Sequence, residues 1–184
     1  MDMSCEIEAK FKVESFAGVR KALRKAGAGY LGTVGQRDTY FDTPDKKLLK
    51  DDTGVRIRRV RCLRSSGAKK DTRPQITFKG PARSRSKAKI RRECQTRIDD
   101  ADALEEILRM IGLTATITIE KRRTSYRLGR CRVELDELPV IGRFVEIEAA
   151  SEKQVLAAAR RLGLSGQPIK DHYVNLVISA RGRG

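Results

Sequence analysis

The segment Cys5-Glu6-Ile7-Glu8-Ala9-Lys10-Phe11 near the start of the chain alternates between two kinds of residue. Its odd-numbered positions are apolar or small, and its even-numbered positions are charged. Successive side chains of a β-strand point to opposite faces, so this period of two predicts a strand over Met3–Val13. One face of that strand suits a hydrophobic core, and the other carries ionisable groups.

The same division recurs in strand after strand. Polar or ionisable residues occupy alternate positions, and mostly apolar residues such as Ile57, Val133 and Ile147 lie between them. The alternating groups are Glu6/Glu8/Lys10, Arg56/Arg58, Thr77/Lys79, Arg91/Glu93/Gln95, Lys121/Arg123, Glu134/Asp136 and Glu146/Glu148. One such strand alone is more typical of a solvated sheet face. Acidic pairs are confined to the first and last strands, however, with basic pairs between them, and this segregation favours a closed barrel whose charged face lines the lumen.

Seven or eight strands and three or four helices are expected in total. The predicted strands are Met3–Val13, Gly29–Phe41, Val55–Cys62, Pro74–Gly80, Lys89–Ile98, Thr114–Leu128, Arg132–Leu138 and Arg143–Ala149. The predicted helices are Phe16–Ala26 capped by Ser15, a segment from Asp99 or Asp100 to Gly112, Ser151–Leu162 and Lys170–Ser179. Leu104, Ile107, Leu108 and Ile111 are expected on the inner side of the second helix. Because the strands come in runs, the fold class is α+β with an antiparallel sheet.

Composition narrows the class of protein. The 184 residues include 40 Lys and Arg against 24 Asp and Glu, which gives a formal net charge of +16. This length suits a single domain, residues 1–184, and no linker divides it. No apolar run approaches the roughly 20 residues that a membrane helix needs. No apolar stretch follows Met1 for a signal peptide to use, so we expect a cytoplasmic protein with no membrane partner.

The cysteines exclude two further classes of site. Cys5, Cys62, Cys94 and Cys131 are scattered singly, and His172 is the single histidine. A thiolate zinc site needs clustered ligands, and nothing indicates export to an oxidising compartment. Four reduced thiols are expected, at least two of them in the core.

Glu6-Ile7-Glu8-Ala9-Lys10 has the form E-x-E-x-K, which resembles the signature of the CYTH superfamily of class IV adenylyl cyclases, thiamine triphosphatases and inorganic triphosphatases. Further elements of that family follow in order along the chain. They are Asp38-Thr39-Tyr40-Phe41-Asp42, Val55-Arg56-Ile57-Arg58, Thr77-Phe78-Lys79-Gly80-Pro81, Arg91-Arg92-Glu93, Glu120-Lys121-Arg122-Arg123, Leu135-Asp136 and Gly142-Arg143-Phe144-Val145-Glu146-Ile147-Glu148. The resemblance covers residues 4 to about 177, followed by a short basic tail.

The resemblance implies an eight-stranded antiparallel closed β-barrel with helices packed outside and a triphosphate-containing small molecule threaded through its tunnel. Divalent metal, Mg²⁺ or Mn²⁺, is then expected at Glu6, Glu8, Asp136, Glu146 and Glu148. The phosphates are expected to contact Lys10, Arg56, Arg58, Lys79, Arg91, Lys121 and Arg123. The family pattern Arg-x-Glu-x-Glu ends here in Gln95, which weakens a metal role for Glu93 and leaves it an equal candidate for orienting a neighbouring Arg. A homodimer is expected by family analogy alone.

The last predicted helix bears on the reaction. Cyclase-like members tend to end in Ser-Tyr-x-x-Leu-Leu, and this chain has Asp171-His172-Tyr173-Val174-Asn175-Leu176-Val177, which keeps the Tyr and lacks the Ser. Tyr173 is therefore a candidate site residue beside the catalytic carboxylates. His172 is interpreted as a surface residue, and a role near the tunnel mouth is the alternative. No motif forms an evident adenine-specific site.

Three functions remain open at this level. A metal-dependent triphosphatase is favoured, and a class IV cyclase that forms cyclic AMP and pyrophosphate is the alternative. A basic nucleic-acid or polyphosphate binding protein is the third, since loops such as Arg83–Lys89 suit phosphate backbones. Few aromatic residues and no Trp count against nucleic acid, and the paired carboxylates count against binding without catalysis.

Overall fold

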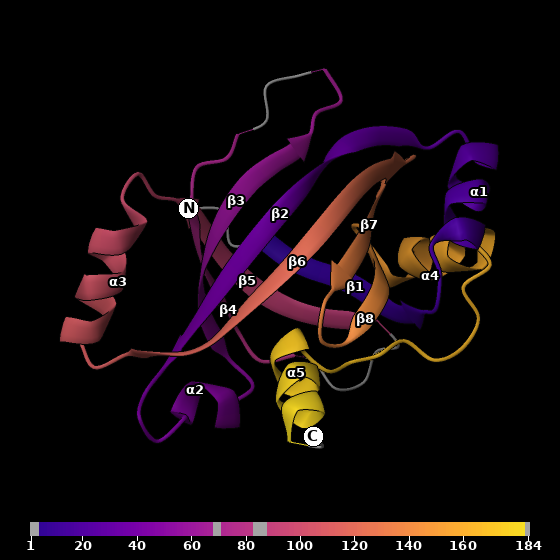
Figure 1. Cartoon of the computed structure of the whole chain (residues 1–184). Helices are drawn as coiled ribbons and strands as arrows, with labels where there is room; N and C mark the ends of the chain where they lie inside the picture. The colour runs from indigo at the N-terminus through magenta and orange to yellow at the C-terminus, as the bar shows by residue number, and fades with distance from the viewer. Residues whose placement is uncertain (1–3, 68–70, 83–87, 183–184) are drawn as a thin grey trace.

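The computed structural model describes residues 4–67, 71–82 and 88–182, and its eight strands close into an antiparallel barrel in the order β1-β5-β4-β3-β2-β6-β7-β8 (Figure 1). The strands are β1 (Ser4–Val13), β2 (Gly29–Asp42), β3 (Gly54–Arg64), β4 (Gln75–Lys79), β5 (Lys89–Arg97), β6 (Thr114–Leu128), β7 (Cys131–Leu138) and β8 (Gly142–Glu148). The predicted fold class and the closure of the sheet are thus confirmed, and each predicted strand lies within a few residues of an observed one.

β1 closes the barrel because its two halves pair with different neighbours. Residues 4–8 pair with β5, and residues 8–13 pair with β8. The register places Glu8 opposite Glu148 and Lys10 opposite Glu146, so charged residues of adjacent strands share one face. A closed sheet leaves that face in the interior, because its apolar counterpart is covered from outside.

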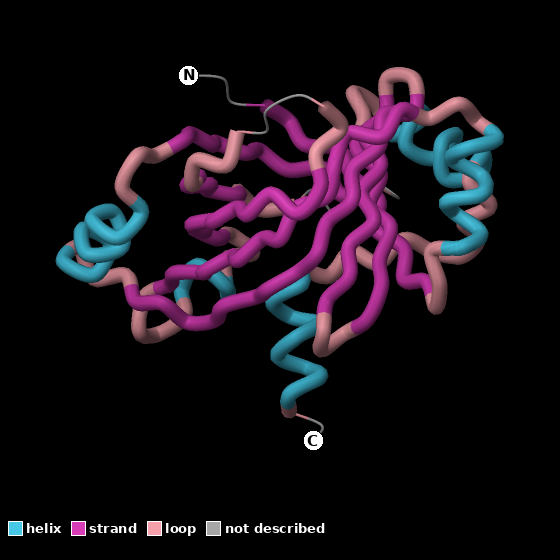
Figure 2. Tube along the Cα trace, turned by 45° about the horizontal axis from the view of Figure 1, so that its top comes forward, coloured by secondary structure: helices cyan, strands magenta, loops and turns pink. Residues whose placement is uncertain are grey.

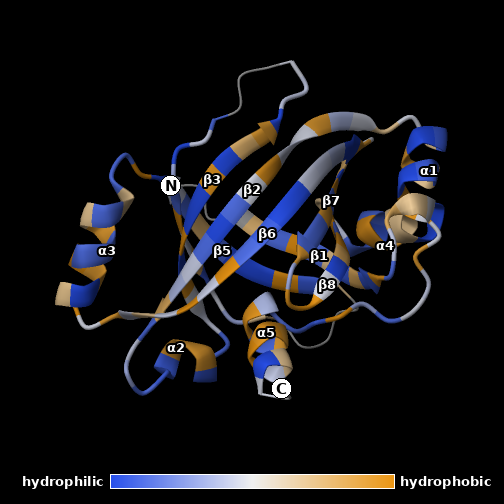
Figure 3. Ribbon diagram, viewed as in Figure 1, coloured by the Kyte–Doolittle hydropathy of each residue, from blue (hydrophilic) through white to orange (hydrophobic). Residues whose placement is uncertain are grey.

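Four helices lie around the outside of the barrel. α1 (Ala17–Lys25) and α4 (Glu152–Arg161) lie side by side at the right edge of Figure 1, α3 (Ala101–Met110) at the left edge and the short α2 (Lys47–Lys50) below (Figures 1 and 2). The main core forms where α1 and α4 cover β1, β7 and β8, with Leu23 and Val155 packed against Val133, Val145 and Ile147. Figure 3 shows the corresponding alternation of hydrophobic and hydrophilic residues along the strands.

The fifth helix, α5 (Tyr173–Arg181), differs from the others because it packs on lumen-facing residues. Tyr173, Val174 and Val177 form a cluster with Ile119 of β6, Leu138 of β7 and Phe144 of β8. Those three strand residues share the parity of Lys121, Asp136 and Glu146, so they belong to the inner face. α5 therefore covers one end of the barrel, at the bottom of Figure 1.

Several sequence-based expectations about helices need correction. Ile107 and Ile111, predicted to be buried, are 53% and 68% exposed, and Leu108 is the buried residue of that turn. α3 packs against the barrel through Ala101 and Leu108. No described residue covers the outer part of its apolar face. The helix α2 was not predicted, because its four residues follow a turn signal and are too few for a periodicity.

The helix ends follow local chemistry. Asp100 caps α3 by accepting from the amides of Asp102 and Ala103, and Ser151 caps α4 by accepting from the amide of Gln154. α1 begins one residue later than expected, after Phe16, and Ser15 Oγ accepts from the amide of Ala17 at 3.2 Å. Gly27 and Gly112 follow α1 and α3 at positive φ of 69° and 91°, which a glycine adopts without a Cβ clash.

Two further expectations concern the cysteines and the loops. All four cysteines are free thiols, but Cys131 alone is buried, so the expected second core cysteine is wrong. Most of the basic loop Arg83–Lys89 and the end of the basic tail lie outside the described residues. In the described part of the chain, no helix has the length and apolar composition needed to cross a membrane.

Candidate active site

The barrel encloses a cavity of about 770 Å³ that every strand helps to line. Twelve of the thirteen predicted site residues line it: Glu6, Glu8, Lys10, Arg56, Arg58, Lys79, Arg91, Lys121, Arg123, Glu146, Glu148 and Tyr173. Asp136 is the exception, because its side chain is fully enclosed behind the lining. The alternation of the strands, which placed these residues on one face, is the reason that they converge.

Asp38 of β2 organises one group of cations in the cavity. Its carboxylate accepts two bonds from Arg58, at 2.6 Å from Nε and 2.7 Å from Nη2, and lies 3.5 Å from Arg56 Nη1. Burial alone would raise the pKa of Asp38, but the charges of Arg58 and Arg56 outweigh it and hold that pKa well below its usual range. Asp38 is a permanent anion whose bidentate contact fixes the direction of Arg58.

Asp136 of β7 likewise organises a second group of cations in the barrel. It accepts from Arg123 Nε at 2.6 Å and from the Tyr173 hydroxyl at 3.1 Å, and Lys121 Nζ lies 3.2 Å away. Burial would raise the pKa of Asp136, and the charges of Arg123 and Lys121 lower it instead. Burial and the neighbouring Arg123 charge lower the pKa of Lys121 to about 8. The carboxylate of Asp136 is therefore already surrounded by donors.

Tyr173 joins α5 to this group. Its ring packs edge-on against Phe144 at 5.2 Å between centroids, and Lys10 Nζ lies 4.0 Å above the ring centroid. Burial and the charge of Asp136 hold the pKa of Tyr173 well above its usual value, so the hydroxyl stays a donor. The ring and hydroxyl orient cations in the lumen while closing the end of the barrel.

Glu8 of β1 and Glu148 of β8 have a different environment. Burial, together with the charges of Glu146 and Glu6, raises the pKa of Glu8. Burial and the charge of Glu6 likewise raise the pKa of Glu148. Glu6 contacts Lys79 Nζ at 2.6 Å, and Lys79 also contacts Glu93 at 2.9 Å, so Glu93 is paired with a lysine instead of an arginine. Glu146 differs from Glu8 and Glu148, because the charges of Arg123 and Lys10 outweigh its burial and hold its pKa well below the usual range. The negative charge that lacks balancing cations is therefore that of Glu8 and Glu148.

Two arginine donors in the lumen have no acceptor within the part of the chain that the structure describes. They are the buried nitrogens Arg56 Nε and Arg91 Nε. Buried donors without partners are costly to a folded protein, so these groups are suited to donating to an anionic ligand. Both arginines belong to the predicted phosphate-binding set.

The structure contradicts the interpretation of His172 as a surface residue. Its Nε2 accepts from Arg91 Nη2 at 2.7 Å, and Lys89 Nζ and Asp52 Oδ1 each lie 3.0 Å away. Burial and the charges of Lys89 and Arg91 lower the pKa of His172 to about 3, so the ring is neutral and its contact with Asp52 is not an ion pair. Both residues line the cavity where α5 begins.

Sequence reasoning therefore missed three residues of this interior, Asp38, Asp52 and Lys89, and gave His172 a role near the tunnel mouth as the alternative only. Asp38 lies within one of the family-like elements, and its alternation with Gln36 and Tyr40 could have marked it as lumen-facing. Asp52 and His172 come from segments without periodicity, so no sequence pattern predicts that their side chains are in contact.

A charged lumen inside an eight-stranded barrel agrees with the family whose model matches this sequence. The family model described as the CYTH domain matches residues 4–167. The chain belongs to the CYTH family. This membership confirms the resemblance predicted from the E-x-E-x-K motif and the elements that follow it.

Individual relatives and solved structures match most of this chain, and two of their names describe different activities. Adenylate cyclase CyaB of Aeromonas hydrophila is 28% identical over 175 residues, covering 90% of this chain and 84% of that protein. The structure of PH1819 from Pyrococcus horikoshii OT3 superposes with a TM-score of 0.80 at 24% identity, covering 95% and 98% of the two chains. HpAC1 of Hippeastrum, described as having a dominant triphosphatase activity, gives a TM-score of 0.69 at 16% identity, covering 95% of each chain.

Proposed function

We propose that this protein is a divalent-metal-dependent triphosphatase that hydrolyses a triphosphate-containing substrate inside the barrel. The observation that supports it is the presence of both kinds of group in one cavity. Glu6, Glu8, Glu146 and Glu148 of the neighbouring strands β1 and β8 line it together with Arg56 and Arg91, whose buried Nε groups have no hydrogen-bond partner among the described residues. A polyphosphate with its bound cation carries charges that complement both the arginines and the carboxylates.

The residues present fit a hard divalent cation such as Mg²⁺ or Mn²⁺. Glu6, Glu8, Glu146 and Glu148 line one cavity, and their oxygens are the ligand type that these ions prefer. No three acidic, histidine or cysteine side chains among the described residues are already arranged around one point. Lys79 and Arg123 pair with Glu6 and Glu146 instead, so loading requires these carboxylates to turn.

The chain's own groups supply orientation and charge. Arg58, fixed by Asp38, and Arg123, fixed by Asp136, present guanidinium groups in set directions. Such preorganised donors stabilise the charge on the phosphoryl oxygens without reorganising during reaction. A bound metal ion would neutralise phosphate charge and lower the pKa of a coordinated water. Water adds to the terminal phosphorus, the bridging P–O bond breaks, and orthophosphate leaves with the shortened product.

A class IV adenylyl cyclase is the second candidate, and one observation favours it. The cavity lining includes an apolar portion near α2 and α5, formed by Leu49, Ile117, Val174 and Ile178 beside Tyr40. An organic group attached to the triphosphate, such as a nucleoside, could be accommodated there. The name of CyaB points in the same direction. We favour hydrolysis because cyclisation also requires a site that holds the ribose 3′-hydroxyl in line with the α-phosphorus.

A product assay tests both candidates. The purified protein is incubated with ATP, inorganic triphosphate and thiamine triphosphate in turn, with Mg²⁺ or Mn²⁺, and the products are resolved by chromatography. Orthophosphate without cyclic nucleotide, abolished by chelator, is the expected result. Cyclic AMP with pyrophosphate would establish the cyclase instead. Salt-sensitive nucleic-acid binding with no turnover of any triphosphate would overturn both.

A further inference from the structure

Two arginines of the lumen are oriented by groups of different charge. Arg58 donates to the buried carboxylate of Asp38 at 2.6 Å. Arg91 donates instead to an imidazole, because its Nη2 lies 2.7 Å from His172 Nε2. A carboxylate compensates the charge of the arginine that it orients, whereas a neutral imidazole fixes the direction of the guanidinium and leaves its charge uncompensated. Arg91 therefore keeps a positive charge available to an anionic ligand.

The rest of the Arg91 guanidinium is free to bind such a ligand. The side chain is 1% exposed, and it lines the cavity together with His172. Its Nε is buried and has no hydrogen-bond partner among the described residues. A buried donor in this condition is stabilised when a ligand accepts from it. Arg91 is thus held at one nitrogen and unpartnered at another.

The carboxylate beside His172 does not replace the imidazole as the partner of Arg91. Asp52 Oδ1 lies 3.6 Å from Arg91 Nη2, and the Asp52 side chain is 48% exposed. Its Oδ2 accepts from the amide of Ala82 at 2.8 Å. An ion pair that is open to solvent on one side contributes little, because water screens it. Asp52 therefore leaves most of the charge of Arg91 uncompensated.

The contacts of His172 Nε2 determine which tautomer this arrangement requires. Lys89 Nζ also lies 3.0 Å from Nε2, so two cationic donors face this nitrogen. A neutral imidazole carries its proton on one nitrogen and accepts at the other, so the proton must be on Nδ1. A proton on Nε2 would instead be donated to Asp52 Oδ1 at 3.0 Å, and the contact with Arg91 would be lost.

We infer that His172 is a positioning residue, which holds Arg91 through a neutral Nε2 acceptor so that Arg91 Nε and its uncompensated charge face a phosphate group of the substrate. His172 acts through Arg91 and does not itself touch the substrate. This inference rests on the proposed function for its ligand, and it assigns a role to a residue from outside the barrel strands.

The tautomer is directly measurable because the chain has a single histidine. Untagged protein with isotope-labelled histidine gives imidazole signals from His172 alone, and heteronuclear correlation spectra distinguish a proton on Nδ1 from one on Nε2. A neutral ring with its proton on Nδ1 is expected at neutral pH. A proton on Nε2, in a neutral or a charged ring, would overturn the inference. This measurement needs no variant, so it decides even if a substitution prevents folding.

Binding of inorganic triphosphate, measured by isothermal titration calorimetry in chelator, tests the positioning role. Chelator keeps the triphosphate intact, because the proposed hydrolysis requires a divalent metal. His172→Ala should raise the dissociation constant by about 3-fold to 10-fold, since ordering one flexible side chain on binding costs affinity of this size. Circular dichroism and thermal melting check the fold of each variant.

Two further variants separate the acceptor from its charge. His172→Gln keeps a neutral acceptor that can reach Arg91, so binding should stay within about twofold of wild type, the usual range for a substitution that removes no interaction. His172→Glu holds Arg91 but compensates its charge, so it should weaken binding more than His172→Ala does. Gln167→Ala is the control, because Gln167 is exposed in the same connection between α4 and α5, and it should bind as wild type.

A double-mutant cycle distinguishes positioning from a general structural role. In the Arg91→Ala background, His172→Ala should change the dissociation constant by less than about twofold, because the group that it holds is absent. An equal loss in both backgrounds would overturn the inference. So would unchanged binding in His172→Ala alone, or a loss in His172→Gln as large as that in His172→Ala.

The titrations also distinguish this inference from the proposed function. The expected pattern of binding, in a protein that hydrolyses no triphosphate with Mg²⁺ or Mn²⁺, supports the inference and refutes the triphosphatase. Hydrolysis by wild type with unchanged binding in His172→Ala does the reverse. Wild-type protein that binds no triphosphate in chelator overturns the inference, and the product assay then decides the triphosphatase alone.

Discussion

Two kinds of buried carboxylate share the lumen, and their surroundings separate them. Asp38 and Asp136 are enclosed by arginine and lysine, and their pKa values are lowered. Glu8 and Glu148 face other carboxylates, and their pKa values are raised. The first kind is already satisfied by the protein and orients its cations. The second kind retains negative charge that a ligand must balance, so the two should respond differently to substitution.

The largest expected effect is on stability, from the first kind. Asp136→Asn leaves Arg123 and Lys121 buried without their counter-ion, and breaking a buried ion pair by removing one partner costs about 3–5 kcal/mol. The free energy of unfolding, measured by denaturant titration, should fall by about that amount. Glu137→Gln on the same strand should change it by less than about 0.5 kcal/mol. A loss below about 1 kcal/mol for Asp136→Asn would show that Asp136 is not a structural anion.

The next effect is on turnover, from the carboxylates that we propose as metal ligands. Glu148→Gln and Glu6→Gln each remove a carboxylate oxygen from the proposed metal face. Metal-dependent turnover should fall by about 100-fold or more, since loss of a group that stabilises transition-state charge has this size. The thermal midpoint should stay near the wild-type value. Normal activity in either variant would remove that residue from the metal site.

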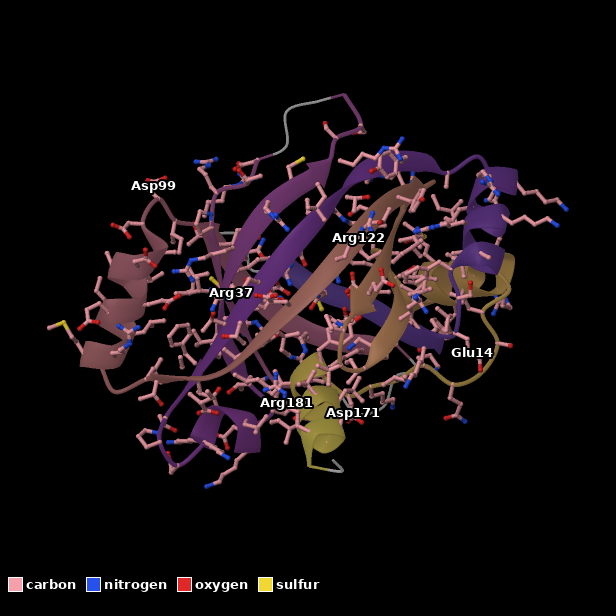
Figure 4. All side chains as sticks on the ribbon, in the orientation of Figure 1. Glu14, Arg37, Asp99, Arg122, Asp171 and Arg181 are labelled. Carbon is pink, nitrogen blue, oxygen red and sulfur yellow. The ribbon has the colours of Figure 1, made fainter. Side chains whose placement is uncertain are left out.

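A smaller effect is expected on substrate binding. Arg58→Ala deletes a guanidinium whose direction is fixed by Asp38, and a hydrogen bond to a charged group is worth about 1.5–3 kcal/mol. KM for the best triphosphate should therefore rise by about 10-fold or more. Arg37→Ala is the control, because Arg37 lies on the exposed side of β2 with its side chain 61% exposed (Figure 4). Equal KM values for the two variants would exclude Arg58 from the phosphate site.

The smallest expected effect is a gain in the free energy of unfolding instead of a loss. Glu8 and Glu148 are directly opposed, and a like-charge pair of this kind costs about 0.2–1 kcal/mol. In chelator at neutral pH, Glu8→Gln should therefore be as stable as wild type or slightly more stable. Burial and the charges of Glu146 and Glu6 raise the pKa of Glu8 in the folded state, so wild type loses stability as pH rises above the unfolded value and through the folded pKa.

Denaturant titrations across pH check this sign. The advantage of Glu8→Gln should disappear at low pH, where Glu8 is protonated in wild type as well. An advantage that persists below pH 4.5, the ordinary pKa of a glutamate, would mean that repulsion between ionised carboxylates is not its cause.

Much of the fold and most of the candidate site could be predicted from the alternation of apolar and charged residues along the strands. Period two in β1, β3, β6 and β8 fixed which side chains share a face, and a closed sheet has only one interior. Eleven predicted strand residues consequently line one cavity, and Tyr173 of α5 joins them. Their roles remain predictions, because lining a cavity does not distinguish a metal ligand from a counter-ion.

The outer surface was harder to predict than the lumen. The spacing of Ile107 and Ile111 in α3 is that of a buried stripe, yet both are exposed because the barrel wall contacts one side of that helix alone. Helical periodicity identifies an apolar face but does not say how much of it a neighbour covers.

The strands, their two faces and the E-x-E-x-K element could be recognised from residues close together in the chain. Which charges became partners depends on the folded arrangement. Asp136 and Glu134 are indistinguishable in an alternating pattern, but Arg123, Lys121 and Tyr173 surround the first, whereas Oε2 of the second has no hydrogen-bond partner among the described residues. His172 reaches Asp52 across 120 residues. Electrostatic partnership depends on distances that only the closure of the barrel and the docking of α5 establish.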